Sequence, residues 1–290
     1  MLTFDELNSE IQAESISDNF EEYLKIYFEG KYSKKCVLGI DIYKYSKYEF
    51  VPQSLLPFLF EHLLHASIKQ CINEEKFIFE KWKLDEFEHK FINTGDGGFI
   101  IFENPIEAII FLSYFQANLH EFNTNNLNIY LKNIVKDITL RYCLTWDDVI
   151  HYSKNHYGPG IINNARILSK DTLNRCLIDS NCYNWFLENI NGIENLININ
   201  LDKLRLADDF KNNNTNLLLI EPANIIIHSK GNSFKNIILS KIGQIDIKNK
   251  MFDVYNLFIQ LNLATDGPNP LKNDYFISIG NINSQGIRFS

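Results

Sequence analysis

The sequence predicts an α+β fold: a ferredoxin-like β-α-β-β-α-β unit whose mixed or antiparallel sheet is flanked by helices and extended by further C-terminal strands. Three observations support this prediction. An apolar run at 35–42 precedes a segment at 52–72 whose apolar residues recur at helical spacing. Two short β-rich runs then meet at the corner Gly95-Asp96-Gly97, which is typical of a hairpin. A second helical pattern and a strand at 138–145 complete the order.

Each element of this unit has its own local signal. The first helix places apolar residues on one face: Leu55, Leu56, Leu59, Leu63, Leu64 and Ile68. The second helix begins at Asn104-Pro105-Ile106-Glu107, where Asn is a favoured cap, Pro a favoured first residue and Glu a favoured third residue. After the strand at 138–145, the glycine turn Tyr157-Gly-Pro-Gly160 opens a further helix.

The chain outside this unit is less regular. Residues 1–30 show apolar residues at helical spacing. A strand and a helix are expected in 175–190, and loops around short strands in the Asn-rich segment 191–235. Residues 236–260 are expected to form two strands about a Gly-Gln or an Asn-Lys turn, and residues 261–290 to be irregular.

The composition excludes several classes of protein. The 290 residues include 28 basic and 36 acidic side chains, for a net charge of −8, which argues against nucleic acid and an anionic membrane surface as partners. No stretch approaches the roughly 18 apolar residues of a membrane span, and the first residues do not resemble a signal peptide. The five cysteines are scattered and odd in number, which fits neither a disulfide framework nor a CxxC zinc site. We therefore expect a reduced, cytoplasmic protein.

Two carboxylates stand where the surrounding pattern does not favour them. Asp41 interrupts an apolar strand, and a charge there is costly unless it is paired or bound to a metal. Asp96 lies at the hairpin tip, where an ordinary Asp-Gly turn is the alternative explanation. Together the two side chains suit divalent cations that are also held by the phosphates of a triphosphate.

Four segments, in order, resemble the motifs of class III nucleotide cyclases. Gly39-Ile-Asp-Ile-Tyr-Lys-Tyr-Ser46 is similar to the first metal motif, and Thr94-Gly-Asp-Gly97 to the second. Gly158 through Arg166 resembles the segment in which a Gly is followed eight residues later by an Arg that stabilises the transition state. Ile247-Lys-Asn-Lys250, with Tyr255-Asn-Leu257 after it, resembles the late strand whose Lys binds the triphosphate.

The resemblance spans about 35–260 and implies a division of the chain. Residues 35–260 would form the cyclase catalytic domain, with 191–235 as a variable insertion. An N-terminal helical segment at 1–34 would precede this domain, and a C-terminal tail at 261–290 would follow it.

The resemblance implies a role for each matched residue. Asp41, Asp96 and the main-chain carbonyl of Ile42 would hold two Mg²⁺ or Mn²⁺ ions. Arg166 would neutralise charge at the α-phosphate, and Lys248 would hold the terminal phosphates. Asp41, Asp96 and Arg166 are therefore the expected catalytic residues.

Further substrate contacts and a partner follow from the same resemblance. The amides of Tyr43, Lys44, Tyr45 and Ser46, expected at the start of the following helix, suit the β- and γ-phosphates. In the family the site lies between two subunits arranged head to tail, which implies a homodimer with two composite sites.

Three departures from the family concern the base and the ribose. The base-reading Lys of adenylate cyclases, four residues before the second metal Asp, is Ile92 here, and its partner Asp falls near Ser153. The ribose-orienting Asn, four residues before the Arg, is Ile162, with Asn163 adjacent as a substitute. The metal and phosphate residues match while the purine reader is absent, which points away from ATP.

The pattern is most similar to that of bacterial Pycsar-type pyrimidine cyclases of anti-phage defence, which make cyclic UMP or cyclic CMP for a separate toxic effector. We expect UTP as the substrate, with Asn93 and Tyr45 as base contacts. CTP or a purine triphosphate is the alternative within this class, and a catalytically silent nucleotide-binding regulator the alternative outside it. Asp41, Asp96 and Arg166 argue against silence, and the GGDEF signature of diguanylate cyclases does not occur.

Several of these residues also have structural explanations. Arg166 is compatible with a surface arginine, and Lys248 with a solvated lysine at a strand end. Arg141 lies within a strand and is expected to pair with a nearby acid. His151 and His156, near the glycine turn, are expected to be solvated, and the histidines show neither an HxxxH nor an HExxH arrangement.

Overall fold

A computed structural model gives the fold of the chain. It describes residues 32–124, 129–152, 155–189, 216–221, 224–228, 234–247, 250–264 and 274–287, together with Asp5, Asn8, Ser9 and Gln12. The helical segment expected at 1–34 lies almost wholly outside the described residues, and the first strand already begins at Tyr32. Among the described helices, none has the length and apolar character that crossing a membrane requires.

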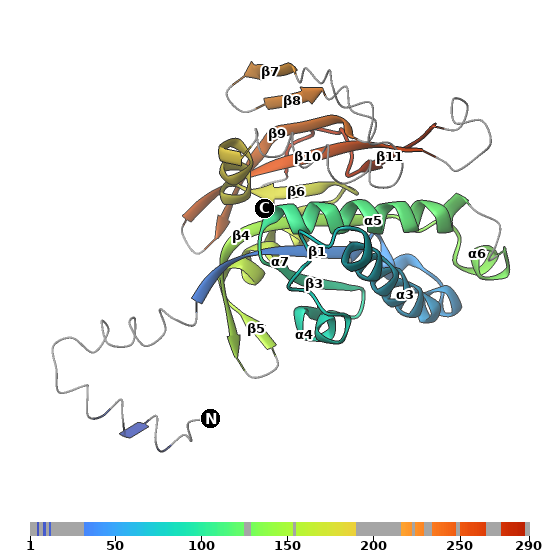
Figure 1. Cartoon of the computed structure of the whole chain (residues 1–290), viewed down its shortest axis with the longest axis horizontal. Helices are drawn as coiled ribbons and strands as arrows, with labels where there is room; N and C mark the ends of the chain where they lie inside the picture. Colours follow the sequence, from blue (N-terminus) through green and yellow to red (C-terminus); the bar gives the residue numbers. More distant parts are fainter. Residues whose placement is uncertain are drawn as a thin grey trace.

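The predicted β-α-β-β-α-β unit is present (Figure 1). Its four strands lie in the order β2-β3-β1-β4, and all three neighbouring pairs are antiparallel. This is the strand order of the ferredoxin-like unit, so the predicted α+β class is confirmed. The elements are β1 (Tyr32–Ile42), α3 (Phe50–Glu74), β2 (Phe91–Asn93), β3 (Gly97–Phe102), α5 (Pro105–Thr124) and β4 (Leu140–Tyr152).

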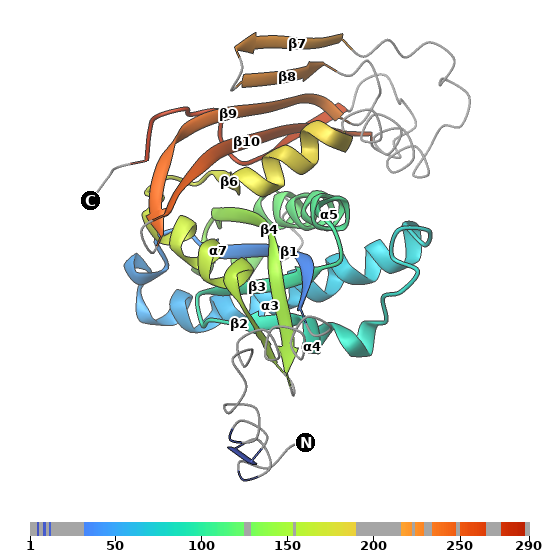
Figure 2. The ribbon, with the colours of Figure 1, turned by 90° about the vertical axis from the view of Figure 1, so that its left-hand side faces the viewer.

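The sheet continues beyond this unit, as expected for the extra C-terminal strands. β6 pairs in parallel with β4, and β10, β9, β8 and β7 follow in that order, with β11 beside β10. Figure 2 shows β9 and β10 as long curved strands beside β6. These strands are β6 (Cys176–Asp179), β7 (Asn216–Glu221), β8 (Asn224–His228), β9 (Phe234–Ile247), β10 (Lys250–Ala264) and β11 (Asp274–Ile279).

The expectation of irregular structure after residue 260 was wrong for 261–264 and 274–279, which are strands, whereas 280–287 have neither helix nor strand, as expected. β10 runs on to Ala264, and β11 pairs with it in a regular antiparallel register from Ile279 back to Asp274. Local Gly and Pro signals at 266–270 dominated that prediction, whereas strand pairing depends on a partner elsewhere in the chain. β9 ends at Ile247 and β10 begins at Lys250, and Gly243 and Gln244 are paired within the ladder, so the Gly-Gln alternative for the turn is wrong.

The remaining described elements are short connections and one helix that matters for the site. They are η1 (Tyr45–Lys47), η2 (Leu84–Glu86), α4 (Phe87–Lys90), α6 (Ile129–Val135), β5 (Asn155–Tyr157) and α7 (Pro159–Lys170). Residues 180–189 are also helical, as expected for the segment after β6.

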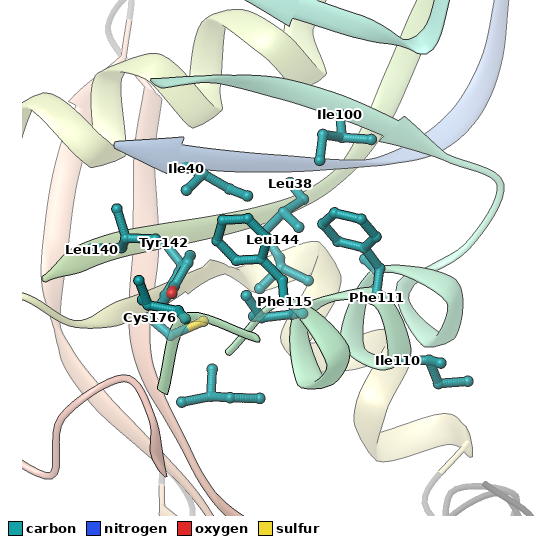
Figure 3. Packing of buried hydrophobic residues seen from close by; sticks show 14 of the residues in the cluster. Leu38, Ile40, Ile100, Ile110, Phe111, Phe115, Leu140, Tyr142, Leu144 and Cys176 are labelled. Atoms are coloured by element: carbon teal, nitrogen blue, oxygen red, sulfur yellow. The ribbon is translucent and has the colours of Figure 1, made fainter. Parts of the chain in front are cut away.

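One face of the sheet packs on α3 and α5. The even-numbered residues Leu38 and Ile40 of β1 point to this side and join one buried cluster with Phe111 and Phe115 of α5 (Figure 3). Each such buried side chain contributes roughly 1.5–3 kcal/mol relative to an exposed one, so this layer is the main core. The predicted helix start is confirmed, because the Asn104 side chain accepts a hydrogen bond of 3.0 Å from the amide of Glu107.

The opposite face of the sheet packs on α7. A Cβ at Gly39 of β1 would overlap the Asn164 side chain and lie 2.6 Å from Leu168 Cδ1, so the absence of a side chain lets the helix approach. Residues alternate along a strand, and Asp41 therefore faces the α7 side. The carboxylate that interrupts the apolar strand is thus kept out of the main core.

Candidate active site

Asp41 lies near the end of β1, between two neighbouring strands. It is in register with Gly97 of β3 on one side and with Arg141 of β4 on the other. The Arg141 Nε donates to Asp41 Oδ2 in an ion pair whose side chains are 24% and 15% exposed. The prediction that Arg141 pairs with a nearby acid is therefore confirmed, and the acid is the predicted metal ligand.

Asp96 lies at the tip of the β2–β3 hairpin, which is fastened to the end of β1. The amide of Ile42 donates a 2.9 Å hydrogen bond to the Asp96 carbonyl, and the amide of Thr94 donates one of 3.1 Å across the tip to Gly97. Gly95 turns the chain with φ of +94°, a conformation that favours glycine. The backbone therefore fixes Asp96 beside Asp41.

Glycine at position 97 allows this close approach. A Cβ there would overlap the Ile40 carbonyl and lie 2.9 Å from the Asp41 Cα. The Gly-Asp-Gly corner is thus needed both for the turn and for the spacing of β3 from β1. The ordinary-turn explanation of Asp96 does not account for its position against a second carboxylate.

The two carboxylates influence each other electrostatically. The pKa of Asp41 is raised, first by burial and also by the Asp96 carboxyl, while Arg141 opposes this rise. Thr94 Oγ1 lies 3.4 Å from Asp96 Oδ1 and donates to it. The structure therefore brings Asp41 and Asp96 together, as the sequence predicts, at a point where negative charge gathers and a cation is favoured.

The donor set fits a metal that takes most of its ligands from elsewhere. Among the described residues, no group of three or more His, Cys, Asp and Glu side chains is placed to hold a metal ion. Two carboxylates alone match the way Mg²⁺ binds in phosphate-processing sites, where water and substrate phosphates complete an octahedron. The role of the Ile42 carbonyl as a further ligand stays a prediction.

The segment after β1 differs from the expected helix start. Residues 45–47 form the 3₁₀ turn η1, and α3 begins only at Phe50. The amide of Tyr43 donates to the Thr139 carbonyl at 2.9 Å, which removes it from the set of phosphate-binding amides. The amides of Lys44, Tyr45 and Ser46 remain candidates for that role.

The side chains of this segment are directed by local contacts. Lys44 adopts a left-handed backbone with φ of 60°, and its ammonium lies 4.6 Å from the centre of the Tyr43 ring. The Tyr45 hydroxyl donates a 3.0 Å hydrogen bond to the Gln53 carbonyl, and its ring packs against the main core. Tyr45 thus has a structural role in addition to the predicted base contact.

Asn163 and Asn164 of α7 are both buried and hydrogen-bonded to the sheet. The Asn163 amide donates a 3.1 Å hydrogen bond to Asp147 Oδ2 on β4. The Asn164 amide donates to the carbonyls of Val37 and Cys143 at 2.8 and 2.9 Å. Both asparagines therefore anchor the helix, and the predicted ribose contact by Asn163 stays a prediction.

Arg166 lies on the other flank of α7 from Asn164. At 100° per residue, Arg166 is about 160° around the helix from Asn164, on the far side of Asn163. Asn164 packs over Gly39 of β1, so Arg166 is directed away from the strand that carries Asp41. Within the described residues, the buried Nη1 of Arg166 has no hydrogen-bond partner. Among the described residues, no hydrogen bond or ion pair joins Arg166 to Asp41 or Asp96.

The remaining predicted residues lie around the hairpin or outside the described part of the chain. Asn93 accepts a 2.7 Å hydrogen bond from the Gly95 amide and donates one of 3.3 Å to Glu61, so it stabilises the tip. Ile92 is half-buried on β2. Lys248 and Ser153 lie outside the described residues.

His156 was expected to be solvated, and this expectation was wrong in part. It is half-buried, its Nε2 lies 2.9 Å from the His89 carbonyl oxygen, and burial lowers its pKa. The contact links the β4–β5 hairpin to α4, and short-range sequence patterns carry no signal for such a link.

Arg141 is a residue of this site that the sequence patterns did not assign to it. Besides Asp41, it contacts the loop after α7, where Nη1 donates a 2.5 Å hydrogen bond to the Asp171 carbonyl. The sequence does show a positively charged residue within an apolar strand, and such a residue requires a counter-charge. The identity of that counter-charge depended on strand register across 100 residues.

Comparisons with known proteins show likeness of fold at low identity. No family model matches the sequence, and no curated protein matches it. The adenylyl cyclase CyaB from P. aeruginosa is 13% identical over 83% of this chain and 98% of its own, with a TM-score of 0.40. An adenylate/guanylate cyclase/hydrolase from Silicibacter pomeroyi is 11% identical over 78% of this chain and 96% of its own, with a TM-score of 0.39. The catalytic core of a rhodopsin-guanylyl cyclase is 12% identical over 78% of this chain and 95% of its own, with a TM-score of 0.37. At these values the likeness assigns neither activity nor substrate to this chain.

Proposed function

We propose that the chain is a metal-dependent nucleotide cyclase that converts UTP to 3′,5′-cyclic UMP and pyrophosphate. The observation that carries this proposal is the meeting of Asp41, on β1, with Asp96, at the tip of the β2–β3 hairpin, where Arg141 of β4 pairs with Asp41. Two carboxylates with an adjacent guanidinium form a site for a triphosphate with its divalent cations.

Bound Mg²⁺ or Mn²⁺ would lower the pKa of the ribose 3′-hydroxyl and neutralise phosphate charge. Asp41 and Asp96 would hold the cations at the end of β1, beside the turn that contains Lys44 and Ser46. Arg141, which pairs with Asp41, would also present its guanidinium to the phosphate chain. These groups align O3′ with the α-phosphorus, so that attack displaces pyrophosphate.

The transition-state arginine would come from a second copy of the chain. Arg166 begins on the flank of α7 away from Asp41, and its buried Nη1 has no partner among the described residues, which supports a second chain as the source of this arginine. We therefore propose a homodimer in which Arg166 and Lys248 of one subunit face Asp41 and Asp96 of the other. Arg166→Ala is expected to lower kcat by about 10²–10³-fold.

Mixing two inactive variants tests this arrangement. Equal amounts of Asp96→Asn and Arg166→Ala subunits should recover about one quarter of wild-type activity, because half of the dimers then carry one intact site. Recovery would be absent if both residues acted within one chain.

The choice of base rests on the half-buried Ile92, which stands where a purine-reading Lys is expected in the resembling family. An aliphatic side chain cannot hydrogen-bond the edge of adenine. UTP is proposed as the substrate, and the cyclic product would act on a separate effector in anti-phage defence.

The experiment is to incubate the purified protein with ATP, GTP, CTP or UTP and Mn²⁺, and to identify the products by mass. Cyclic UMP is expected from wild type and from Asp85→Asn, a control at an exposed carboxylate of η2. Asp96→Asn should abolish it. Cyclic CMP in place of cyclic UMP would keep the proposed mechanism and show that the choice of UTP is wrong. The absence of a cyclic product from every nucleotide would show that the proposed function is wrong.

A further inference from the structure

The loop between α7 and β6, residues 171–175, contacts the candidate site at two points. The Asp171 carbonyl accepts from Arg141 at 2.5 Å, and the Thr172 carbonyl accepts from the Tyr43 hydroxyl at 3.1 Å. Arg141 lies opposite Asp41 on the neighbouring strand, and Tyr43 follows Asp41 by two residues in the sequence. The position of this loop therefore sets where the Arg141 guanidinium lies.

The buried side chain of Arg175 fixes the shape of the 171–175 loop. Its side chain is 2% exposed, and its Nε and Nη2 both donate to the Asp171 carboxylate, the Nη2 contact being 2.7 Å. The Arg175 carbonyl accepts a 2.8 Å hydrogen bond from the amide of Tyr142, the residue after Arg141. Removing either member of such a buried pair leaves an uncompensated charge, so the pair holds the loop in one geometry.

The remaining nitrogen of Arg175 binds a distant part of the chain. Nη1 donates to the carbonyls of Asn283 and Gln285 at 3.2 and 2.5 Å. These residues belong to the segment 280–287, which follows β11 and which we call the C-terminal strap. The guanidinium thus joins the loop at the site to the end of the described chain.

The strap is built to stay in place without regular secondary structure. The Asn281 and Asn283 side chains accept hydrogen bonds of 2.9 Å from the amides of Asn283 and Gln285. The Asn281 carbonyl accepts from the buried Asn256 amide at 2.7 Å. Ile287 is 5% exposed and packs in the cluster that contains Ile167 and Leu168 of α7. The strap is therefore a docked element with its own apolar anchor.

We infer that the C-terminal strap, acting through Arg175 and Asp171, is a positioning element that holds Arg141 where it pairs with Asp41 and receives the triphosphate. The inference rests on the proposed function, since it assigns Arg141 to phosphate binding. Arg175 and Asp171 touch neither substrate nor metal in this arrangement, and they act through the Asp171 carbonyl. Because coupling between two sites is reciprocal, a ligand at the carboxylates must also stabilise the docked strap.

Hydrogen exchange measures this reciprocity directly in the full-length protein. The probe is Mn²⁺ with a UTP analogue whose 3′-hydroxyl is absent, so that binding occurs without turnover. The amides of Asn283, Gln285 and Ile287 are all hydrogen-bonded, and their exchange should slow about fivefold or more on binding. Arg175→Lys keeps a positive charge beside Asp171 but loses the guanidinium that binds Asp171 and the strap at once. In this variant, binding of the analogue should no longer slow the exchange of the strap amides.

A matched pair of core variants separates positioning from stability. Ile287→Ala loosens the strap, whereas Ile277→Ala removes the same volume from β11, where Ile277 is 3% exposed. Ile287→Ala and Arg175→Lys should raise the dissociation constant of the analogue about fivefold or more, and Ile277→Ala should leave it unchanged at equal loss of stability.

The possible outcomes are distinct. Analogue binding that depends on Asp41, with no change in strap exchange and equal affinity in Arg175→Lys, would overturn the inference and leave the proposed function standing. Equal weakening by Ile277→Ala would show a stability effect alone and would also overturn it. Absence of Asp41-dependent binding would overturn the proposed function and the inference with it.

Discussion

The ion pair between Asp41 and Arg141 is expected to be coupled both to stability and to metal binding. Arg141→Met removes the guanidinium that neutralises Asp41, whose side chain is only 15% exposed. Breaking a fully buried pair costs about 3–5 kcal/mol, whereas an exposed pair contributes about 0–1 kcal/mol. With 24% exposure on the Arg141 side, we expect Arg141→Met to lower the free energy of unfolding by about 2 kcal/mol without metal.

The double-mutant cycle isolates the pair. Asp41→Asn removes the uncompensated charge, so the double variant Asp41→Asn, Arg141→Met should be more stable than the sum of the single effects predicts, by about 1–2 kcal/mol. Urea unfolding in EDTA at neutral pH measures all four proteins. The matched control is Lys35 with Glu103, an ion pair near the other end of β1 whose side chains are 22% and 41% exposed, where coupling of about 1 kcal/mol or less is expected.

Addition of Mn²⁺ gives the second measurement. If Asp41 and Asp96 bind the cation, the metal supplies the missing counter-charge, and it should stabilise Arg141→Met more than wild type. Coupling below about 0.5 kcal/mol, or equal stabilisation of both proteins by Mn²⁺, would refute the view that Arg141 acts as the counter-ion of the metal-binding carboxylates.

Two further predictions concern the packing and the charges around the site. Gly39→Ala places a Cβ over Asn164 and 2.6 Å from Leu168 Cδ1, so it should lower the free energy of unfolding by about 1–3 kcal/mol in urea, whereas Gly286→Ala, whose Cβ would lie 3.3 Å from the Ile242 carbonyl oxygen, should lower it less. Burial raises the pKa of Asp179 from its ordinary value of 3.8 to about 7, so the folded protein binds this proton more tightly than the unfolded chain and its stability falls as the pH rises through that window. The free energy of unfolding of Asp179→Asn, relative to that of wild type, should therefore rise by at most about 4 kcal/mol between about pH 4 and about pH 8. A difference between the two proteins that does not change with pH would contradict this.

Local sequence patterns were sufficient for the unit that carries the carboxylates. The apolar run of β1, the Gly-flanked corner and the cap at Asn104 each depend on contacts within a few residues. The joint role of Asp41 and Asp96 was predicted from their two motifs, and the structure brings them together because β3 pairs with β1 and places the hairpin tip at the end of β1. For this reason the two metal-ligand candidates could be predicted from the sequence alone.

The surroundings of these carboxylates could not be predicted, because they depend on pairs far apart in the chain. Arg141 meets Asp41 through strand register, and Arg175 meets the strap across 108 and 110 residues. The strap itself has no periodicity, since its hydrogen bonds go to side-chain oxygens and to one buried guanidinium. A sequence that reads as irregular is here held by specific polar contacts.

The packing of α7 is what supports a site shared by two chains. Asn164 must lie over Gly39, because its amide satisfies the carbonyls of both Val37 and Cys143 at once. Helix geometry then places Arg166 about 160° away, on the flank that turns from β1. A buried guanidinium nitrogen without a partner among the described residues is costly, and it is retained more readily where it serves a ligand. In the proposed homodimer, this flank of α7 would face the carboxylates of another subunit.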